Sequence, residues 1–121
     1  MGMNYYVKFK DRKVNQPDLH IGKKSIGWEF SFQGYEEDTY YNTPQLLSKK
    51  EWFEYLFLNS DLIYNEEDKQ IEFLEFVKIV LDSKKNTDNK NHYDYCKNSN
   101  YDLSDLLLDE EGFSISLTDF S

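Results

Sequence analysis

Large apolar and polar residues alternate in two segments near the start of the chain, residues 5–10 and 27–33. A period of two is typical of a strand with one buried face. The side chains expected to be buried are Tyr5, Val7, Phe9, Trp28, Phe30 and Phe32. A shorter apolar piece, residues 19–22, predicts a further short strand that leads into the second segment.

Two later stretches follow the period of a helix. Ser48 and Glu51 have the spacing of a capping box, which predicts a helix that begins there and ends near Asn59. A second helix is predicted where apolar residues recur at i, i+3, i+4, i+7 and i+8. The expected apolar faces are Trp52, Phe53, Leu56 and Phe57 in the first helix, and Phe73, Phe76, Val77, Val80 and Leu81 in the second.

The remaining pattern completes the predicted fold. Residues 84–102 are rich in Asn, Lys, Asp and Ser, which predicts a mobile surface loop. Apolar residues 106–108 and 113–117 flank an acidic turn that ends in Gly112, and this pattern favours a hairpin. We therefore expect one domain, residues 1–121, of the α+β class: a small antiparallel sheet with two helices packed on one face.

Composition excludes several classes. Among 121 residues, 23 are acidic and 14 are Lys or Arg, so the net charge is −9, which argues against general binding of nucleic acids. Aromatic residues make up 17%, enough apolar surface to argue against disorder. No apolar run approaches the ~20 residues of a membrane span, and residues 1–20 lack a secretory signal. Cys96 is the only cysteine, which fits a reducing compartment.

The charge is unevenly distributed, and it draws attention to one motif. Residues 1–30 hold six basic and three acidic residues, whereas the rest hold eight and twenty. In the basic part, two glycines flank two lysines and a serine, just before an aromatic strand. Glycines allow close backbone approach to an anion, lysine and serine supply a charge and a hydroxyl, and an aromatic ring can stack on a base. The candidate ligand-binding residues are His20, Gly22, Lys23, Lys24, Ser25, Gly27 and Trp28. The structural alternative is a tight turn with its lysines in solvent.

Other groupings are weaker. His92, Asp94 and Cys96 lie close in sequence, but two histidines and one cysteine cannot form a Cys/His zinc site alone, so we expect a solvated loop and no metal. No adjacent residue is expected to activate Cys96. The acidic, Tyr-rich residues 35–41 could imitate a phosphate backbone or form a solvated loop.

Residues 20–32 resemble a segment shared by small proteins of tailed phages, with the pattern H-I-G-K-S-S-x-G-W-x-F-x-F. Lys24 replaces a serine of that pattern. Weaker likeness in Glu51-Trp52 and in residues 73–80, 109–114 and 119–121 extends it over most of the chain. Many of those proteins carry Cys-x-x-Cys just upstream of the histidine, which is consistent with zinc, but residues 13–17 hold no cysteine, so no metal is implied here. The resemblance implies a phage accessory protein made in the cytoplasm of an infected bacterium.

Three functions follow as hypotheses. The first is a non-enzymatic anti-defence protein that captures an anionic ligand, such as a host immune signalling nucleotide, without a cofactor. The second is an acidic inhibitor that imitates DNA and occupies the basic surface of a host defence protein. An enzyme ranks last, because no acid–base pair or metal set is visible in the sequence. A homo-oligomer is a further hypothesis, because so small a chain has little room for an enclosed pocket and its ligand site could lie at a subunit interface.

Overall fold

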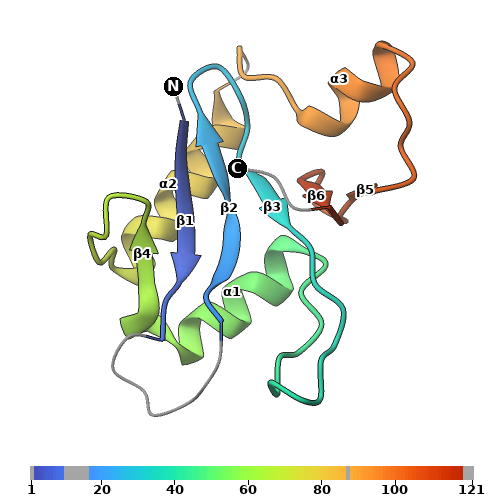
Figure 1. Cartoon of the computed structure of the whole chain (residues 1–121). Coiled ribbons are helices and arrows are strands. Elements are labelled where there is room, and N and C mark those ends of the chain that lie inside the picture. The colour runs from blue at the N-terminus through green and yellow to red at the C-terminus, as the bar shows by residue number, and fades with distance from the viewer. Residues whose placement is uncertain (1, 10–16, 87, 119–121) are drawn as a thin grey trace.

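The computed structural model describes residues 2–9, 17–86 and 88–118, which form a six-stranded sheet and three helices (Figure 1). The strands are β1 (Gly2–Val7), β2 (Leu19–Ser25), β3 (Ser31–Gln33), β4 (Ile63–Asn65), β5 (Leu106–Leu108) and β6 (Ser114–Ser116). The helices are α1 (Lys49–Leu58), α2 (Phe73–Lys85) and α3 (His92–Asn98), with a 3₁₀ turn, η1 (Ser60–Leu62). No helix of the described part of the chain is long and apolar enough to cross a membrane.

The predicted α+β class is confirmed, and the sheet is larger than expected. Its strand order is β4-β1-β2-β3-β6-β5. The prediction of an antiparallel sheet is wrong at one junction, because β3 and β6 run parallel while every other named pair is antiparallel. The long connection through α1, α2 and α3 permits this pairing, since parallel neighbours need a crossover of a dozen or more residues.

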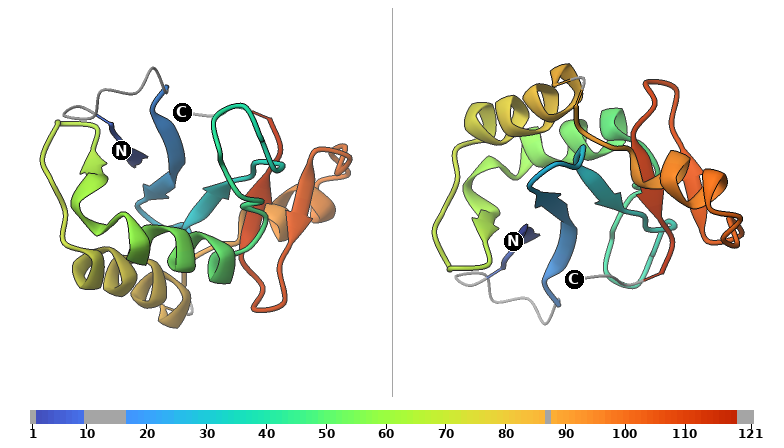
Figure 2. Two further views of the ribbon diagram at one scale, coloured as in Figure 1. Left: turned by 90° about the horizontal axis from the view of Figure 1, so that it is seen from below. Right: turned by 90° about the horizontal axis from the view of Figure 1, so that it is seen from above.

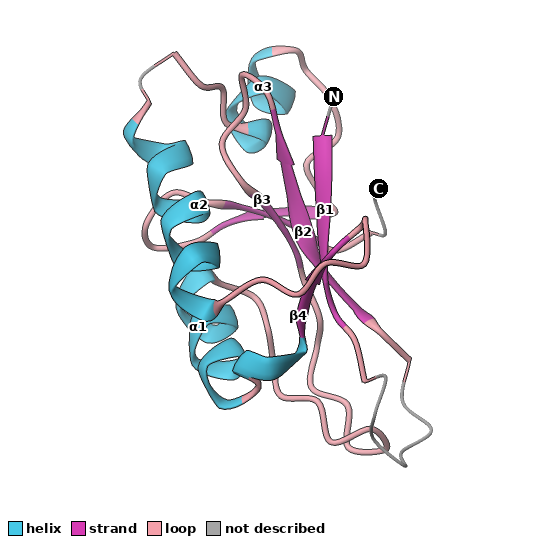
Figure 3. Cartoon of the chain, turned by 90° about the vertical axis from the view of Figure 1, so that its left-hand side faces the viewer, coloured by secondary structure: helices cyan, strands magenta, loops and turns pink. Residues whose placement is uncertain are grey.

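Helices α1 and α2 lie side by side across one face of the sheet, as predicted (Figures 2 and 3). Alternation along the strands sends apolar side chains to that face, where they meet the helices. The fully buried residues here include Val7, Ile21, Phe30, Trp52 and Phe76. The Phe30 ring centroid lies 5.4 Å from that of Phe76, at 88°. Burying each such side chain contributes about 1.5–3 kcal/mol, so this interface supplies most of the driving force for folding.

Sequence patterns locate α1 well. The Ser48 hydroxyl accepts a hydrogen bond from the Glu51 N–H (3.0 Å), and the Glu51 carboxylate accepts one from the Leu47 N–H (2.9 Å). Asn59 is the C-cap, as predicted. The predicted apolar face is partly wrong, because Phe57 is 67% exposed while Trp52 and Leu56 are buried.

Two further predictions need correction. Only residues 31–33 of the predicted strand 27–33 pair as β3. Residues 25–28 form a tight turn, in which the Trp28 N–H donates to the Ser25 carbonyl (3.1 Å) and Gly27 has φ +84°. The predicted loop 84–102 contains α3, whose Cys96 is buried. This helix has seven residues and one buried side chain, so it leaves no apolar period in the sequence.

Candidate functional site

A β-bulge in β2 decides which face its side chains occupy. Tyr5 pairs with Gly22 and Tyr6 pairs with His20, so Ile21 is an extra residue in β2. Simple alternation would place His20 and Lys23 on opposite faces. The bulge resets that alternation, because one added residue shifts every later side chain to the other face.

Side-chain contacts confirm that the bulge moves the residues after Ile21 to the other face. The His20 Nε2 atom lies 2.9 Å from Oδ1 of Asn4 on β1. A Cβ atom added at Gly2, which shares the Asn4 face, would overlap the Lys23 side chain and lie 2.7 Å from the Ser25 hydroxyl. His20, Lys23 and Ser25 therefore share the sheet face that lies away from α1 and α2.

This second face, which we call the open face, is lined by polar residues of four strands. Ser31 and Gln33 of β3 pair with Ser114 and Ser116 of β6, while the residues between them, Phe32 and Ile115, are buried in the core. The residues of the open face are Asn4, Tyr6, His20, Lys23, Ser25, Ser31, Gln33, Ser114 and Ser116. Five of these residues are buried, so only part of the open face is accessible: Asn4, His20, Gln33, Ser114 and Ser116 are the buried ones.

One hollow of the open face, which we call the α3 pocket, lies between the sheet and α3 and has a volume of about 450 Å³. Its principal residues are Lys23, Ser25, Trp28, Ser31, His92, Cys96, Asp102 and Asp105. Lys23, Ser25 and Trp28, which were predicted to bind a ligand, thus lie beside residues about seventy positions later in the sequence. Its size falls within the roughly 300–1,000 Å³ of small-molecule sites.

The turn that carries Trp28 also holds α3. The Lys90 N–H donates to the Gly27 carbonyl (2.9 Å), and the Glu29 N–H donates to the Lys90 carbonyl (2.8 Å). The Trp28 ring contacts Tyr95 edge to face, with centroids 5.3 Å apart at 81°. Trp28 is therefore a docking point for α3 as well as a wall of the pocket.

A buried polar network fixes the start of α3. The Asn91 side chain accepts from the Asp94 N–H (3.1 Å) and donates to Glu29 Oε1 (3.1 Å) and the Gly112 carbonyl (2.9 Å). Lys84 Nζ donates to the same two oxygens, at 2.9 and 2.7 Å. These bonds link α2, α3 and the β5–β6 turn, because a carboxylate and a carbonyl oxygen can each accept more than one donor.

His92 and Cys96 are one turn apart on α3, and Cys96 Sγ lies 3.8 Å from His92 Nε2. Helix α3 therefore places an imidazole beside the Cys96 sulfur. Burial lowers the pKa of His92, so its imidazole is neutral at pH 7. No group of three or more metal-binding side chains occurs within residues 2–9, 17–86 and 88–118.

Both signs of charge line the α3 pocket. Lys23 provides an ammonium group, while Asp102 and Asp105 provide two exposed carboxylates. Hydrogen bonds from the Ser104 backbone N–H and hydroxyl lower the pKa of Asp102, so it is ionised at neutral pH. A third carboxylate of the lining, Glu29, is paired with Lys84 Nζ (2.9 Å), so the pocket offers a cation, two exposed anions and several hydroxyls to one ligand.

The other predicted residues lie elsewhere. Gly22 faces the core, where a Cβ atom would overlap the Ser31 carbonyl and lie 2.6 Å from the Phe30 ring. Lys24 Nζ donates to the Ser25 carbonyl (2.6 Å), and burial lowers the pKa of Lys24. The motif is thus a strand followed by a tight turn at residues 25–28, the conformation of the structural alternative.

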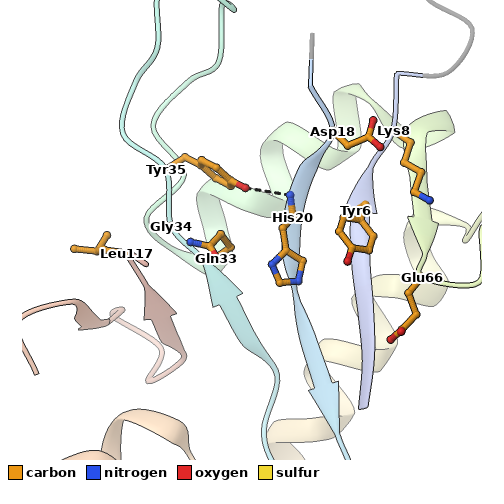
Figure 4. A pocket seen from close by; sticks show the side chains of 9 residues that line it. All are labelled: Tyr6, Lys8, Asp18, His20, Gln33, Gly34, Tyr35, Glu66 and Leu117. Atoms are coloured by element: carbon orange, nitrogen blue, oxygen red, sulfur yellow. Dashed lines mark hydrogen bonds between the residues drawn. The ribbon is translucent and has the colours of Figure 1, made fainter. Parts of the chain in front are cut away.

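His20 lines a separate hollow, which we call the His20 pocket (Figure 4). The Tyr35 hydroxyl accepts a hydrogen bond from the His20 N–H (3.0 Å), and the Tyr6 ring lies 5.2 Å from the imidazole. The motif is therefore divided between two hollows of one face.

Sequence reasoning missed Ser31, His92, Cys96, Asp102 and Asp105 as neighbours of Lys23. The i, i+4 spacing of His92 and Cys96 behind Asn91, a good N-cap residue, is the one local signal that could have indicated α3. Nothing local indicates that α3 packs against the Trp28 turn. Comparison with protein-family models, curated proteins and solved structures finds no match for this chain.

Proposed function

We propose that this protein is a non-enzymatic binding protein that captures a small nucleotide-like ligand in the α3 pocket. The observation that carries the proposal is the meeting of Lys23, Ser25 and Trp28 with two carboxylates in one hollow of about 450 Å³. Lysine binds phosphate as a point charge, carboxylates accept hydrogen bonds from sugar hydroxyls, and the indole offers an apolar wall to a base. One ammonium beside two carboxylates favours a ligand with a single phosphate group over a polyphosphate.

Capture is favoured over catalysis because binding requires only this complementarity. His92 and Cys96 are the groups of the pocket that resemble a base and a nucleophile, with Cys96 Sγ 3.8 Å from His92 Nε2. Among the described residues no third group bonds His92 Nδ1 to orient the imidazole, as it is oriented in a catalytic triad. The resemblance of residues 20–32 to tailed-phage proteins supports an anti-defence role, in which capture lowers the concentration of a host signalling nucleotide.

The test is mass spectrometry of small molecules released by heating the protein purified from infected or defence-active bacteria. We expect a nucleotide of unchanged mass, retained by the wild type and by Lys24→Ala but lost from Lys23→Ala. This pair is matched, because both variants remove one lysine from β2 and only Lys23 lines the pocket. A product of altered mass would indicate catalysis, and equal retention by both variants would refute the proposed site.

A second function, inhibition of a basic defence protein by an acidic surface, is favoured by one observation. Glu36, Glu37 and Asp38 are exposed on an ordered loop, in which Asp38 and Thr43 exchange backbone hydrogen bonds of 2.9 and 2.8 Å. An ordered acidic surface loses less entropy on binding than a flexible one. Reversing these three charges while leaving Lys23 intact distinguishes the functions, since only the inhibitor should lose activity.

A further inference from the structure

The His20 pocket is a hollow of the open face with a volume of about 860 Å³, and its lining side chains come from several neighbouring strands (Figure 4). Gln33 and Leu117 lie at one end, and Glu66 lies at the other. The His20 and Tyr6 rings lie between them, with centroids 5.2 Å apart. A ligand that contacts both ends must therefore be long and must pass over the two rings.

At one end of the pocket, a buried acceptor has no partner. Gln33 is 4% exposed, and its Nε2 donates to the carbonyls of Ser116 (3.1 Å) and Thr118 (3.0 Å). These bonds fix the amide and direct its nitrogen toward β6. The Gln33 Oε1 atom is buried and has no hydrogen-bond partner in the described part of the chain. An unpaired buried acceptor is costly, so a donor supplied by a ligand would be stabilised here.

At the other end, Glu66 supplies a carboxylate that is only partly used. Its Oε1 accepts from the Asn4 backbone N–H (2.7 Å) and side-chain amide (3.4 Å). No hydrogen bond to Oε2 occurs among the described residues, and a carboxylate can accept about four bonds. The exposed carboxylate of Asp18 also lines the hollow.

Among the described residues of the lining there is one cation, Lys8, and an ion pair offsets its charge. Lys8 Nζ lies 2.9 Å from Asp68 Oδ1. Two carboxylates, a buried amide oxygen and two rings therefore remain to contact a ligand. Carboxylates and aromatic faces both favour a positive group.

We propose that the His20 pocket binds an elongated organic cation with donor nitrogens at both ends, such as an aliphatic polyamine or an extended arginine side chain. One nitrogen donates to Gln33 Oε1 and the other to Glu66, while the aliphatic chain lies over the Tyr6 and His20 rings. This proposal is independent of the α3 pocket, because the two hollows share no lining residue.

The test is calorimetric titration of the full chain with spermidine and, in a second arm, with a short arginine peptide. The informative variant is Glu66→Gln, because glutamine keeps the acceptor for Asn4 and removes only the charge. Its matched control is Glu67→Gln, which makes the same change of net charge at the next, exposed position outside the pocket. We expect Glu66→Gln to weaken spermidine binding about fivefold to tenfold and Glu67→Gln to weaken it less than about twofold.

Binding of spermidine supports a free polyamine as the ligand, and binding of the peptide alone supports an arginine presented by a partner. Equal weakening by the two variants would show nonspecific attraction to an acidic protein and would overturn the proposal. Absence of binding by both cations in the millimolar range would overturn it too. If Glu66→Gln does not fold, Asp18→Asn and its exposed control Asp61→Asn provide the same comparison.

Discussion

Substituting Asn91 by alanine tests whether the polar network at the start of α3 holds the α3 pocket together. The side chain is 7% exposed and makes three hydrogen bonds, one to the helix backbone and two to groups outside α3. Alanine fills part of the same space and makes none of them. We expect α3 to separate from the sheet more often, because a seven-residue helix is far shorter than the ~12–15 residues needed for stability alone.

The magnitude follows from the bonds that are lost. Removing an N-cap side chain costs about 1 kcal/mol, and removing a bond to a carboxylate costs about 1.5–3 kcal/mol. Lys84 still bonds both Glu29 and the Gly112 carbonyl, so neither acceptor is left unpaired and the two costs do not add fully. We expect a loss of about 2 kcal/mol, which corresponds to an opening of α3 about 30 times more frequent.

Hydrogen exchange of the α3 amides measures this opening directly. Protection of these amides should fall about 30-fold in Asn91→Ala, while that of the α1 and α2 amides should change little. The control is Asn98→Ala in the last turn of α3, where the exposed side chain makes no hydrogen bond to another described residue. Unchanged protection in Asn91→Ala would refute the role of the network, and an equal fall in both variants would show a general weakening of the helix.

Three further predictions concern residues that support or line the α3 pocket. Ser83→Ala should lower the free energy of unfolding by about 1–3 kcal/mol in urea titration, because it leaves the buried Phe30 N–H, now 2.9 Å from the Ser83 hydroxyl, without an acceptor; the exposed Ser60→Ala should change it little. Gly27→Ala should cost about 1–2 kcal/mol through backbone strain alone, since φ is +84° and no atom lies within 4 Å of the added Cβ; an unchanged thermal midpoint would contradict this account. Burial lowers the pKa of His92 from 6.5, so between that lowered pKa and pH 6.5 the unfolded chain binds a proton that the folded chain does not. The contribution of His92 to the free energy of unfolding should therefore be fully present above pH 6.5 and fall as the pH drops through this window. In urea titrations between these pH values, the midpoint of His92→Gln should depend less on pH than that of the wild type.

Much of the core can be predicted because its signals are local. Alternation identifies Tyr5, Val7 and Phe9 as buried, and all three are at most 7% exposed. The Ser48–Glu51 spacing locates the start of α1, since a cap is formed by residues three positions apart. The flanked acidic turn correctly predicts the hairpin β5–β6, whose strands are antiparallel.

The candidate site depends on contacts between distant segments. The extra residue Ile21 is defined only by the pairing of β2 with β1, and it brings His20, Lys23 and Ser25 onto one face. Helix α3 is too short to be stable without Asn91 and the Trp28 turn, so its local sequence resembles that of a loop.

The sequence by itself therefore determined the α+β class and most of the buried face, and it offered residues 20–28 as a candidate site. The tertiary structure decided that this segment is a strand and turn, that its side chains divide between two hollows, and that His92, Cys96, Asp102 and Asp105 complete one of them. The physical reason is the distance along the sequence between the residues that make contact. Burial and capping follow from residues a few positions apart. The β1–β2 register is set by pairs 12 to 23 residues apart, the docking of α3 by bonds across about 60 residues, and the parallel β3–β6 pair by contacts across 83 residues, as between Ser31 and Ser114.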